Sequence, residues 1–222
     1  MQTDQKLKEA LTAQLNYWVG RSANNIQVLV KDCTVTLRGC VPSYAEKREC
    51  IETVQRVAGV KAVADELVVE IPETRQRTDA EIASAAINAI SWITTVPPNS
   101  IKIIVRDGQL VLEGMVEEWS QRNAVEDVVR HLPGITGITN LLTTRPQPLA
   151  PDVKLAIESA FERHALLDSS KIDVDVVGSK VTLRGNISSI AEREEAERAA
   201  RTARGVTDVE NKIAIVIPKY EY

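Results

Sequence analysis

Long hydrophobic runs are missing from this sequence of 222 residues. No segment approaches the roughly 18 consecutive apolar residues that a membrane-spanning helix needs. Residues 1–10 also lack the apolar stretch and the small-residue cleavage site of a secretory leader. We therefore expect a protein with no transmembrane segment, which is cytoplasmic as the sequence is written and periplasmic if a leader peptide has been removed.

An excess of positive charge is missing as well. The formal net charge is −4, and the composition, 44% hydrophobic and 26% charged, is typical of a folded globular protein. No third of the chain is basic enough to attract nucleic acid or anionic lipid by charge alone. Residues 134–137 read GITG, which matches the GxxG of KH modules, but they follow a helical pattern and precede a strand instead of joining two helices. We expect no nucleic-acid partner.

Reactive side chains are few. Cys33, Cys40 and Cys50 all lie in the first third of the chain, their number is odd, and their spacing is not that of a zinc site, so we expect reduced thiols. His131 and His164 are not spaced as metal ligands or as catalytic partners, and we expect structural roles for both. Because no nucleophile constellation, metal cluster or phosphate loop is present, we expect no enzyme and no cofactor.

Carboxylates are plentiful, but their pattern does not indicate a site. Residues 192–204 alternate acidic and basic side chains, which is typical of a solvated helix face with pairs one turn apart. Asp173 and Asp175 project from the outer face of a predicted strand, where they could meet a cation, yet nothing completes a coordination shell. The sequence therefore predicts no metal site.

What the sequence does contain is a threefold repeat. The stretch VTLRG at residues 35–39 returns as LVLEG at 110–114 and as VTLRG at 181–185. About twenty positions later, each copy has a glycine before a β-branched residue. These pairs are Gly59-Val60, Gly134-Ile135 and Gly205-Val206. The repeat predicts three domains, which span residues 1–73, 79–146 and 151–218.

Each repeat has the pattern of an α-β-β-α-β unit. A helical stripe with period 3.6 comes first, followed by two alternating strands joined by a two-residue turn, a second helix, and a third strand expected to run parallel to the second. Asp4, Asp79 and Asp152 lie where a helix N-cap is expected. The glycine after the second strand indicates a close approach, of a helix in our interpretation, or a bulge. The glycine of each later pair is expected at the end of the second helix in the left-handed conformation.

This pattern, with Val-x-Leu-x-Gly on the second strand and Gly-Val or Gly-Ile before the third, resembles the BON domain (bacterial osmotically inducible and nodulation domain) in all three repeats. The resemblance implies an α+β fold: three tandem modules, each a three-stranded mixed sheet packed on two helices. It also implies a non-enzymatic binding protein that associates with a phospholipid surface or a protein partner, in osmotic-stress protection. The alternative is a module that senses a small ligand or a cation such as potassium. No site residues carry over, because the family has no agreed catalytic motif.

Four aromatic residues lie off the core stripes. Tyr17 and Trp92 take the same place in successive first helices, and Tyr44 and Trp119 match at the start of the second helices. The third repeat has Arg163 and Ile190 there. One interpretation is that the rings cover the edges of small cores or fill contacts between repeats. The other is an interaction patch on the first two repeats, since amphipathic rings suit a protein or lipid-headgroup surface.

Overall fold

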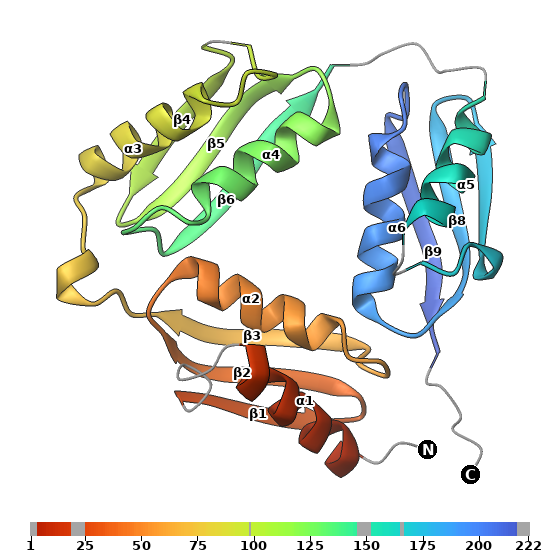
Figure 1. Cartoon of the computed structure of the whole chain (residues 1–222), viewed down its shortest axis with the longest axis horizontal. Helices are drawn as coiled ribbons and strands as arrows, with labels where there is room; N and C mark the ends of the chain where they lie inside the picture. Colours follow the sequence, from red (N-terminus) through yellow and green to blue (C-terminus); the bar gives the residue numbers. More distant parts are fainter. Residues whose placement is uncertain (1–3, 19–24, 98, 146–151, 165–166, 217–222) are drawn as a thin grey trace. The chain divides into compact units, whose positions relative to one another are not determined.

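The computed structural model describes residues 4–18, 25–97, 99–145, 152–164 and 167–216 (Figure 1). Within these residues the element order α-β-β-α-β occurs three times. The proline-rich linker 146–151 and the C-terminal residues 217–222 lie outside the described residues, as do the outermost residues of the three domains expected from the sequence.

The helices and strands follow the repeat. The first repeat contains α1 (Asp4–Trp18), β1 (Ile26–Lys31), β2 (Thr34–Val41), α2 (Tyr44–Gln55) and β3 (Ala62–Val69). The second contains α3 (Asp79–Ser91), β4 (Ile101–Arg106), β5 (Gln109–Val116), α4 (Trp119–Val129) and β6 (Gly137–Thr144). The third contains α5 (Val153–Arg163), β7 (Ile172–Val177), β8 (Lys180–Ile187), α6 (Ile190–Thr202) and β9 (Asp208–Ile215). Two short 3-10 helices, η2 (Glu73–Arg75) and η3 (Ser169–Lys171), precede α3 and β7.

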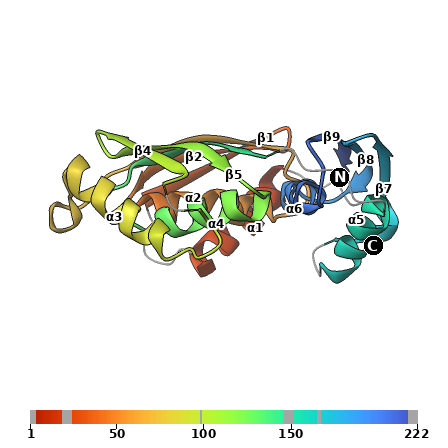
Figure 2. The ribbon, with the colours of Figure 1, turned by 90° about the horizontal axis from the view of Figure 1, so that it is seen from above.

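Each repeat forms its own three-stranded sheet with the second strand in the middle. In the second repeat β4 pairs antiparallel with β5, so that Ile103 faces Leu112, and β6 pairs parallel with β5, so that Asn140 lies beside Leu112. The third repeat has the same register. Figure 2 shows α3 and α4 on one side of β4 and β5. The predicted α+β fold, with mixed sheets and two helices per module, is confirmed.

Contacts between Cα atoms group the chain into two compact units. One consists of residues 1–38, 50–66 and 146–222, and the other of residues 39–49 and 67–145. The second repeat lies within the latter unit and the third within the former. The domain boundaries expected from the sequence stay a prediction.

A separate hydrophobic core lies between helices and sheet in the second and third repeats. Strand residues with alternating burial, such as Leu110 and Leu112 on β5, meet the apolar stripes of both helices. Burial of each such side chain contributes about 1.5 to 3 kcal/mol. The core of the second repeat consists of Ile82, Ala86, Val96, Leu110, Leu112, Val116, Val125, Val129, Ile135 and Leu142. In the core of the third repeat, Phe161 and Ile157 of the first helix α5 pack on Val181 and Leu183 of the middle strand β8.

The glycine that ends the repeated strand motif is required by a backbone contact. A Cβ added to Gly114 would lie 2.1 Å from the carbonyl oxygen of Ser100, and one added to Gly185 would lie 2.0 Å from that of Lys171. Both glycines also have a positive φ, +145° and +149°. The expected close approach is therefore confirmed, but the neighbour is neither α-helix of the repeat: it is the chain just before the first strand, Ser100 in the second repeat and the last residue of η3, Lys171, in the third.

The aspartate at the start of the first helix does not cap it. Thr78 is the N-cap of α3, and its side chain accepts the N–H of Glu81. The carboxylate of Asp79 instead accepts the backbone N–H groups of Asp107 and Gly108 in the hairpin turn, at 2.9 and 3.0 Å. Asp152 occupies the N-cap position of α5, but its side chain makes no capping hydrogen bond. The N-cap prediction for Asp79 is wrong. Thr78 caps the helix, and the Asp79 carboxylate accepts the N–H groups of the hairpin turn instead.

The first repeat has the same link between helix and hairpin. Asp4 accepts the N–H groups of Asp32 and Cys33, at 3.0 and 3.3 Å. Both turn residues have a positive φ, 50° and 61°, although neither is glycine. The carboxylate satisfies the two N–H groups that this turn presents, which stabilises a conformation that a side chain normally disfavours.

The glycine before the third strand has the expected conformation but not the expected place. Gly134 and Gly205 have φ values of 89° and 87°. The C-caps of α4 and α6 are Arg130 and Ala203, so each glycine lies in the turn beyond the helix. A Cβ on Gly134 would lie 2.9 Å from the Cδ1 atom of Ile82, so this turn closes the second core against α3.

We predict that Gly185→Ala destabilises the third repeat by about 2 to 4 kcal/mol, because a new Cβ meets a backbone oxygen that cannot move away. Gly178→Ala is the matched control in the same repeat: its φ is also positive, at +57°, but nothing lies within 4 Å of the added Cβ. It should cost only about 1 kcal/mol. Hydrogen exchange of the β8 amides, read by mass spectrometry, measures both. Equal protection in the two variants would contradict the steric explanation.

A second prediction concerns pH and the N-terminus of α3. The Thr78 backbone N–H, and after it the Thr78 hydroxyl, donate to the Glu81 carboxylate and hold its pKa below the ordinary value of 4.5. A lowered pKa stabilises the fold above pH 4.5, and this contribution is lost as the pH falls through the lowered value. The wild type should therefore be more stable than Glu81→Gln at neutral pH, and this difference in the free energy of unfolding should disappear in acid.

The direct measurement is an NMR titration of the Glu81 carboxyl group. In Thr78→Val the pKa should rise towards its ordinary value, since the hydroxyl is gone. Ser84→Ala, one turn further along α3, is the control that should leave the titration unchanged, because Ser84 donates to the carbonyl oxygen of Ala80 instead. A titration unaffected by Thr78→Val would show that the hydroxyl does not hold the carboxylate.

Candidate interaction surface

Two of the four aromatic residues singled out in the sequence are strongly exposed. Trp92 is the C-cap of α3, where its backbone N–H reaches the carbonyl oxygens of Ala89 and Ile90, while its side chain is 85% exposed. Tyr17 lies in the last turn of α1 and is 80% exposed. Both side chains are therefore largely exposed to solvent at the end of a first helix.

The other two rings begin the second helices and are half-buried. Trp119 is the first residue of α4. Tyr44, the first residue of α2, packs against the hydrophobic core of the second repeat. The guanidinium carbon of Arg122, one turn along α4, lies 4.7 Å from the centroid of the Trp119 ring. At that distance a cation–π attraction contributes about 0.5 to 1 kcal/mol at an exposed site.

Both tryptophans lie at the same end of the second repeat. The side chain of Gln121 donates from Nε2 to the carbonyl oxygen of Thr95, at 2.5 Å. Thr95 follows Trp92 by three residues, and Gln121 follows Trp119 by two. The same Gln121 side chain accepts the N–H of Glu117 at 2.7 Å, which fixes the start of α4. One amide thus holds together the two chain segments that carry the tryptophans.

A polar network that the sequence interpretation missed holds α4 on β6. Arg122 donates from Nε to the carbonyl oxygen of Leu142 (3.2 Å) and from a terminal nitrogen to that of Asn140 (3.0 Å). The Asn140 amide donates in turn to the Glu126 carboxylate at 2.8 Å and accepts the N–H of Leu142. These bonds fix Arg122, which then lies against the Trp119 ring. The network therefore orients an aromatic ring of the candidate patch.

The third repeat keeps the asparagine contacts of this network without an aromatic ring. Asn211 donates to the carbonyl oxygen of Arg193 (3.1 Å) and to Glu197 (3.2 Å), and it accepts the N–H of Ile213. The residue matching Trp119 is Ile190, which is only 5% exposed. The sequence signal that could have revealed the network is an asparagine two positions before a buried residue of the third strand, found in the second and third repeats at the same register.

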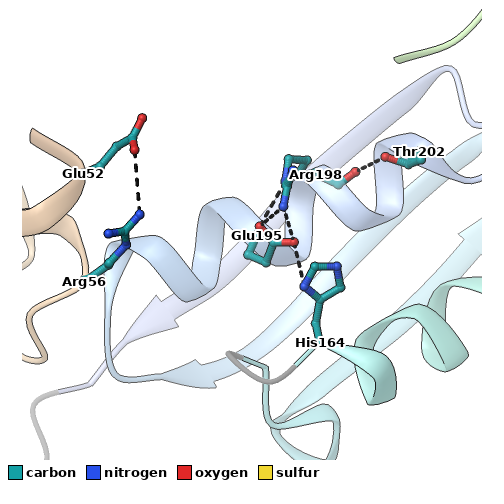
Figure 3. Close-up of polar contacts among 6 residues, drawn as sticks. All are labelled: Glu52, Arg56, His164, Glu195, Arg198 and Thr202. Carbon is teal, nitrogen blue, oxygen red and sulfur yellow. Dashed lines mark hydrogen bonds and ion pairs between the residues drawn. The ribbon is translucent and has the colours of Figure 1, made fainter. Parts of the chain in front are cut away.

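The two histidines make ordinary polar contacts. His164, the C-cap of α5, lies with Nδ1 3.1 Å from the carboxylate of Glu195 on α6, which also binds Arg198 at 2.6 Å (Figure 3). Only 12% of the Glu195 side chain is exposed. The His131 ring accepts a hydrogen bond from the Arg130 side chain. Both contacts fit the structural roles expected from the sequence, and the first joins the two helices of the third repeat.

Nothing in the described part of the chain forms a metal site. Among those residues, no group of three or more His, Cys, Asp or Glu side chains could hold a metal ion. The three cysteines are free thiols, and the Glu70 carboxylate, which accepts a hydrogen bond from Cys40, raises the pKa of that thiol. The alternative prediction, a cation-sensing module, stays a prediction. No described helix has the length and hydropathy to span a bilayer.

Comparison with known proteins identifies the family. The family model of the BON domain matches residues 3–71, 78–146 and 151–216, which is most of the chain. The chain belongs to the BON domain family. The resemblance of all three repeats that was drawn from the glycine motifs is therefore confirmed.

Among characterised BON relatives, the chain is similar to Osmotically-inducible protein Y of Escherichia coli K12, with 28% identity over 152 residues, 63% of this chain and 70% of the relative. Among solved structures it is similar to the C-terminal domain of CdsD, a structural protein of the type III secretion system of Chlamydia trachomatis, and to the PrgH periplasmic domain. The CdsD domain is 13% identical, the match covers 94% of this chain and 96% of that chain, and the TM-score is 0.26. The PrgH domain is 10% identical, the match covers 86% of this chain and 95% of that chain, and the TM-score is 0.22. TM-scores this low carry no structural argument.

We predict that Arg122→Gln releases the Trp119 ring of the second BON repeat. The variant loses the cation–π contact and two hydrogen bonds to β6, at a cost of about 1 to 2 kcal/mol. Acrylamide should then quench Trp119 fluorescence more strongly, measured with Trp18 and Trp92 replaced by Phe. Arg106→Gln, at the exposed end of β4, is the control that should change nothing. Unchanged quenching in Arg122→Gln would show that the arginine does not hold the ring.

Proposed function

We propose that this BON-family chain is a non-enzymatic binding protein that attaches to phospholipid surfaces through the aromatic ends of its first two repeats. The contact residues are Tyr17, Trp92 and Trp119; Tyr44 packs against the core of the second repeat and supports this end from within. The observation that carries the proposal is the 85% exposure of Trp92 at the end of a helix. The name of the E. coli relative supports a role under osmotic stress.

The chain segment that carries Trp92 is uncharged, which supports contact with the boundary between headgroups and acyl chains. No charged residue occurs between Glu81 and Lys102, a stretch that includes nearly all of α3. The outer face of this helix presents Ile87, 58% exposed, and the small polar residues Ser84, Asn88 and Ser91. A face of this kind has no charge to desolvate when it leaves water, so the gain from the apolar side chains is not offset.

Attachment through this surface is hydrophobic and aromatic in origin. Residues 79–146 contain eight acidic and five basic side chains, a formal charge of −3, so the second repeat as a whole is repelled by anionic lipid. Tryptophan is favoured at the membrane interface because its ring is apolar and its indole N–H still reaches a hydrogen-bond acceptor. Binding should therefore need no anionic lipid and should survive salt that screens charges.

The test is co-flotation of the full chain with phosphatidylcholine vesicles. Trp92→Ala should weaken binding by roughly 10-fold, since burial of one large apolar side chain contributes about 1.5 to 3 kcal/mol. Leu155→Ala on α5 is the matched control: this leucine is 64% exposed on the first helix of the third repeat, which lacks the rings. The converse variant, Arg163→Trp, places a ring at the exposed matching position of α5 and should strengthen binding.

Several results would overturn the proposal. The lipid contact is wrong if the wild type stays with the soluble fraction at all vesicle concentrations, or if Trp92→Ala and Leu155→Ala bind alike. Circular dichroism of each variant checks that the fold is retained. Binding that appears only with anionic vesicles and vanishes in high salt would contradict the hydrophobic mode.

A further inference from the structure

The outer face of the second sheet, opposite the helices, carries an apolar surface that the third repeat does not share. On this face Leu141 is 54% exposed, Met115 50% and Ile104 37%, and Val111 between them is half-buried. The pairing of the strands makes these residues neighbours, because Ile104 faces Val111 on β5, and Leu141 on β6 lies beside Glu113, between Val111 and Met115. We call these four residues the sheet patch.

The equivalent positions of the third repeat are all polar. They hold Asp175, Thr182, Asn186 and Lys212, in the same strand register. Nearby on that face Arg184 and Glu210 make ion pairs with Asp175 and Lys212. Since the two sheets share one backbone arrangement, the fold does not require apolar residues at these places. Large contiguous apolar patches on a surface usually mark a contact.

The sheet patch surrounds one charged residue, Glu113, whose pair with Lys102 is self-complementary. Lys102 on β4 faces Glu113 on β5, and the Nζ and Oε2 atoms are 3.2 Å apart. A two-fold axis that runs along the strands between β4 and β5 brings Lys102 of one molecule against Glu113 of a second, and Ile104 against Val111. In such an isologous contact each favourable pair occurs twice, once in each direction. A partner of one strong charge would find no matching charge here.

We propose that a second copy of this chain covers the sheet patch, so that two second repeats pack sheet against sheet. Aligned packing of two sheets buries the facing side chains in a layer about 10 Å thick. The contact uses the face of the sheet that the helices leave open, so it does not depend on the proposed attachment of the aromatic residues to lipid.

The first test is the mass of the full chain by light scattering after size exclusion, at about 1 to 100 μM, the range in which weak dimers dissociate. We expect a concentration-dependent dimer. Ile104→Glu should raise the dissociation constant at least ~10-fold, because it places a charge against Val111 of the second copy, at the axis of the contact. Val177→Glu is the matched control, a 73% exposed strand residue of the third repeat, and should stay dimeric. Trp92→Ala should also stay dimeric. A wild type that remains monomeric, or an Ile104→Glu variant with the dissociation constant of the wild type, overturns the proposal.

The second test uses charge reversal and separates contact between copies from the ion pair within one. Lys102→Glu leaves two acidic residues beside the patch, and Glu113→Lys leaves two basic ones, so each variant alone should be monomeric. Mixed together they should form a heterodimer, which native mass spectrometry resolves by mass. If the mixture remains monomeric although each variant keeps its circular dichroism spectrum, the two copies do not meet through this face.

Discussion

The close approach of two backbone segments at one glycine is the constraint on which the rest of each module depends. In the second and third repeats the carbonyl oxygen of the residue before the first strand occupies the space where a side chain of Gly114 or Gly185 would lie. The chain arriving from the first helix can therefore join the sheet directly against its middle strand. Because the middle strand holds both neighbours in register, displacing this contact would disturb the antiparallel pair, and with it the surface on which both helices pack.

Polar side chains then fix the helices over that sheet. At one end of the second repeat Asp79 holds the start of α3 to the hairpin, and at the other Gln121 joins the start of α4 to the segment after α3. Between them Asn140 and Arg122 hold α4 to β6. Small cores bury limited apolar surface, so these bonds determine where each helix lies more than how stable the module is. The aromatic end of the helix layer is positioned by this framework.

The sequence was sufficient for the elements and for the strand pairing, since these follow from periodicity and from residues such as Gly134, whose positive φ few other residues accept. The sequence was insufficient where neighbouring residues could each fill the same structural role. Thr78 and Asp79 are both good N-caps, and only the position of the hairpin decides that Thr78 caps the helix. The contact between Arg122 and Trp119 was likewise invisible, because an arginine one turn after an aromatic residue has many alternative partners. Exposure of Tyr17 and Trp92 could be inferred, because both lie off the apolar stripe.

The three repeats share a backbone and differ in what they present to their surroundings. The glycine motif and the asparagine network recur because folding needs them, and for that reason they carry no information on a partner. The residues that vary lie on the two surfaces that folding leaves free, the end of the helix layer and the open face of the sheet. At the matched positions the third repeat has Ile190, which is buried, and Asp175, whereas the second has Trp119 and Ile104. Exposed apolar side chains lower the solubility of a monomer. The third repeat exposes Leu155 and Val177 elsewhere, so the difference between the repeats is one of position and not of the amount of exposed apolar surface.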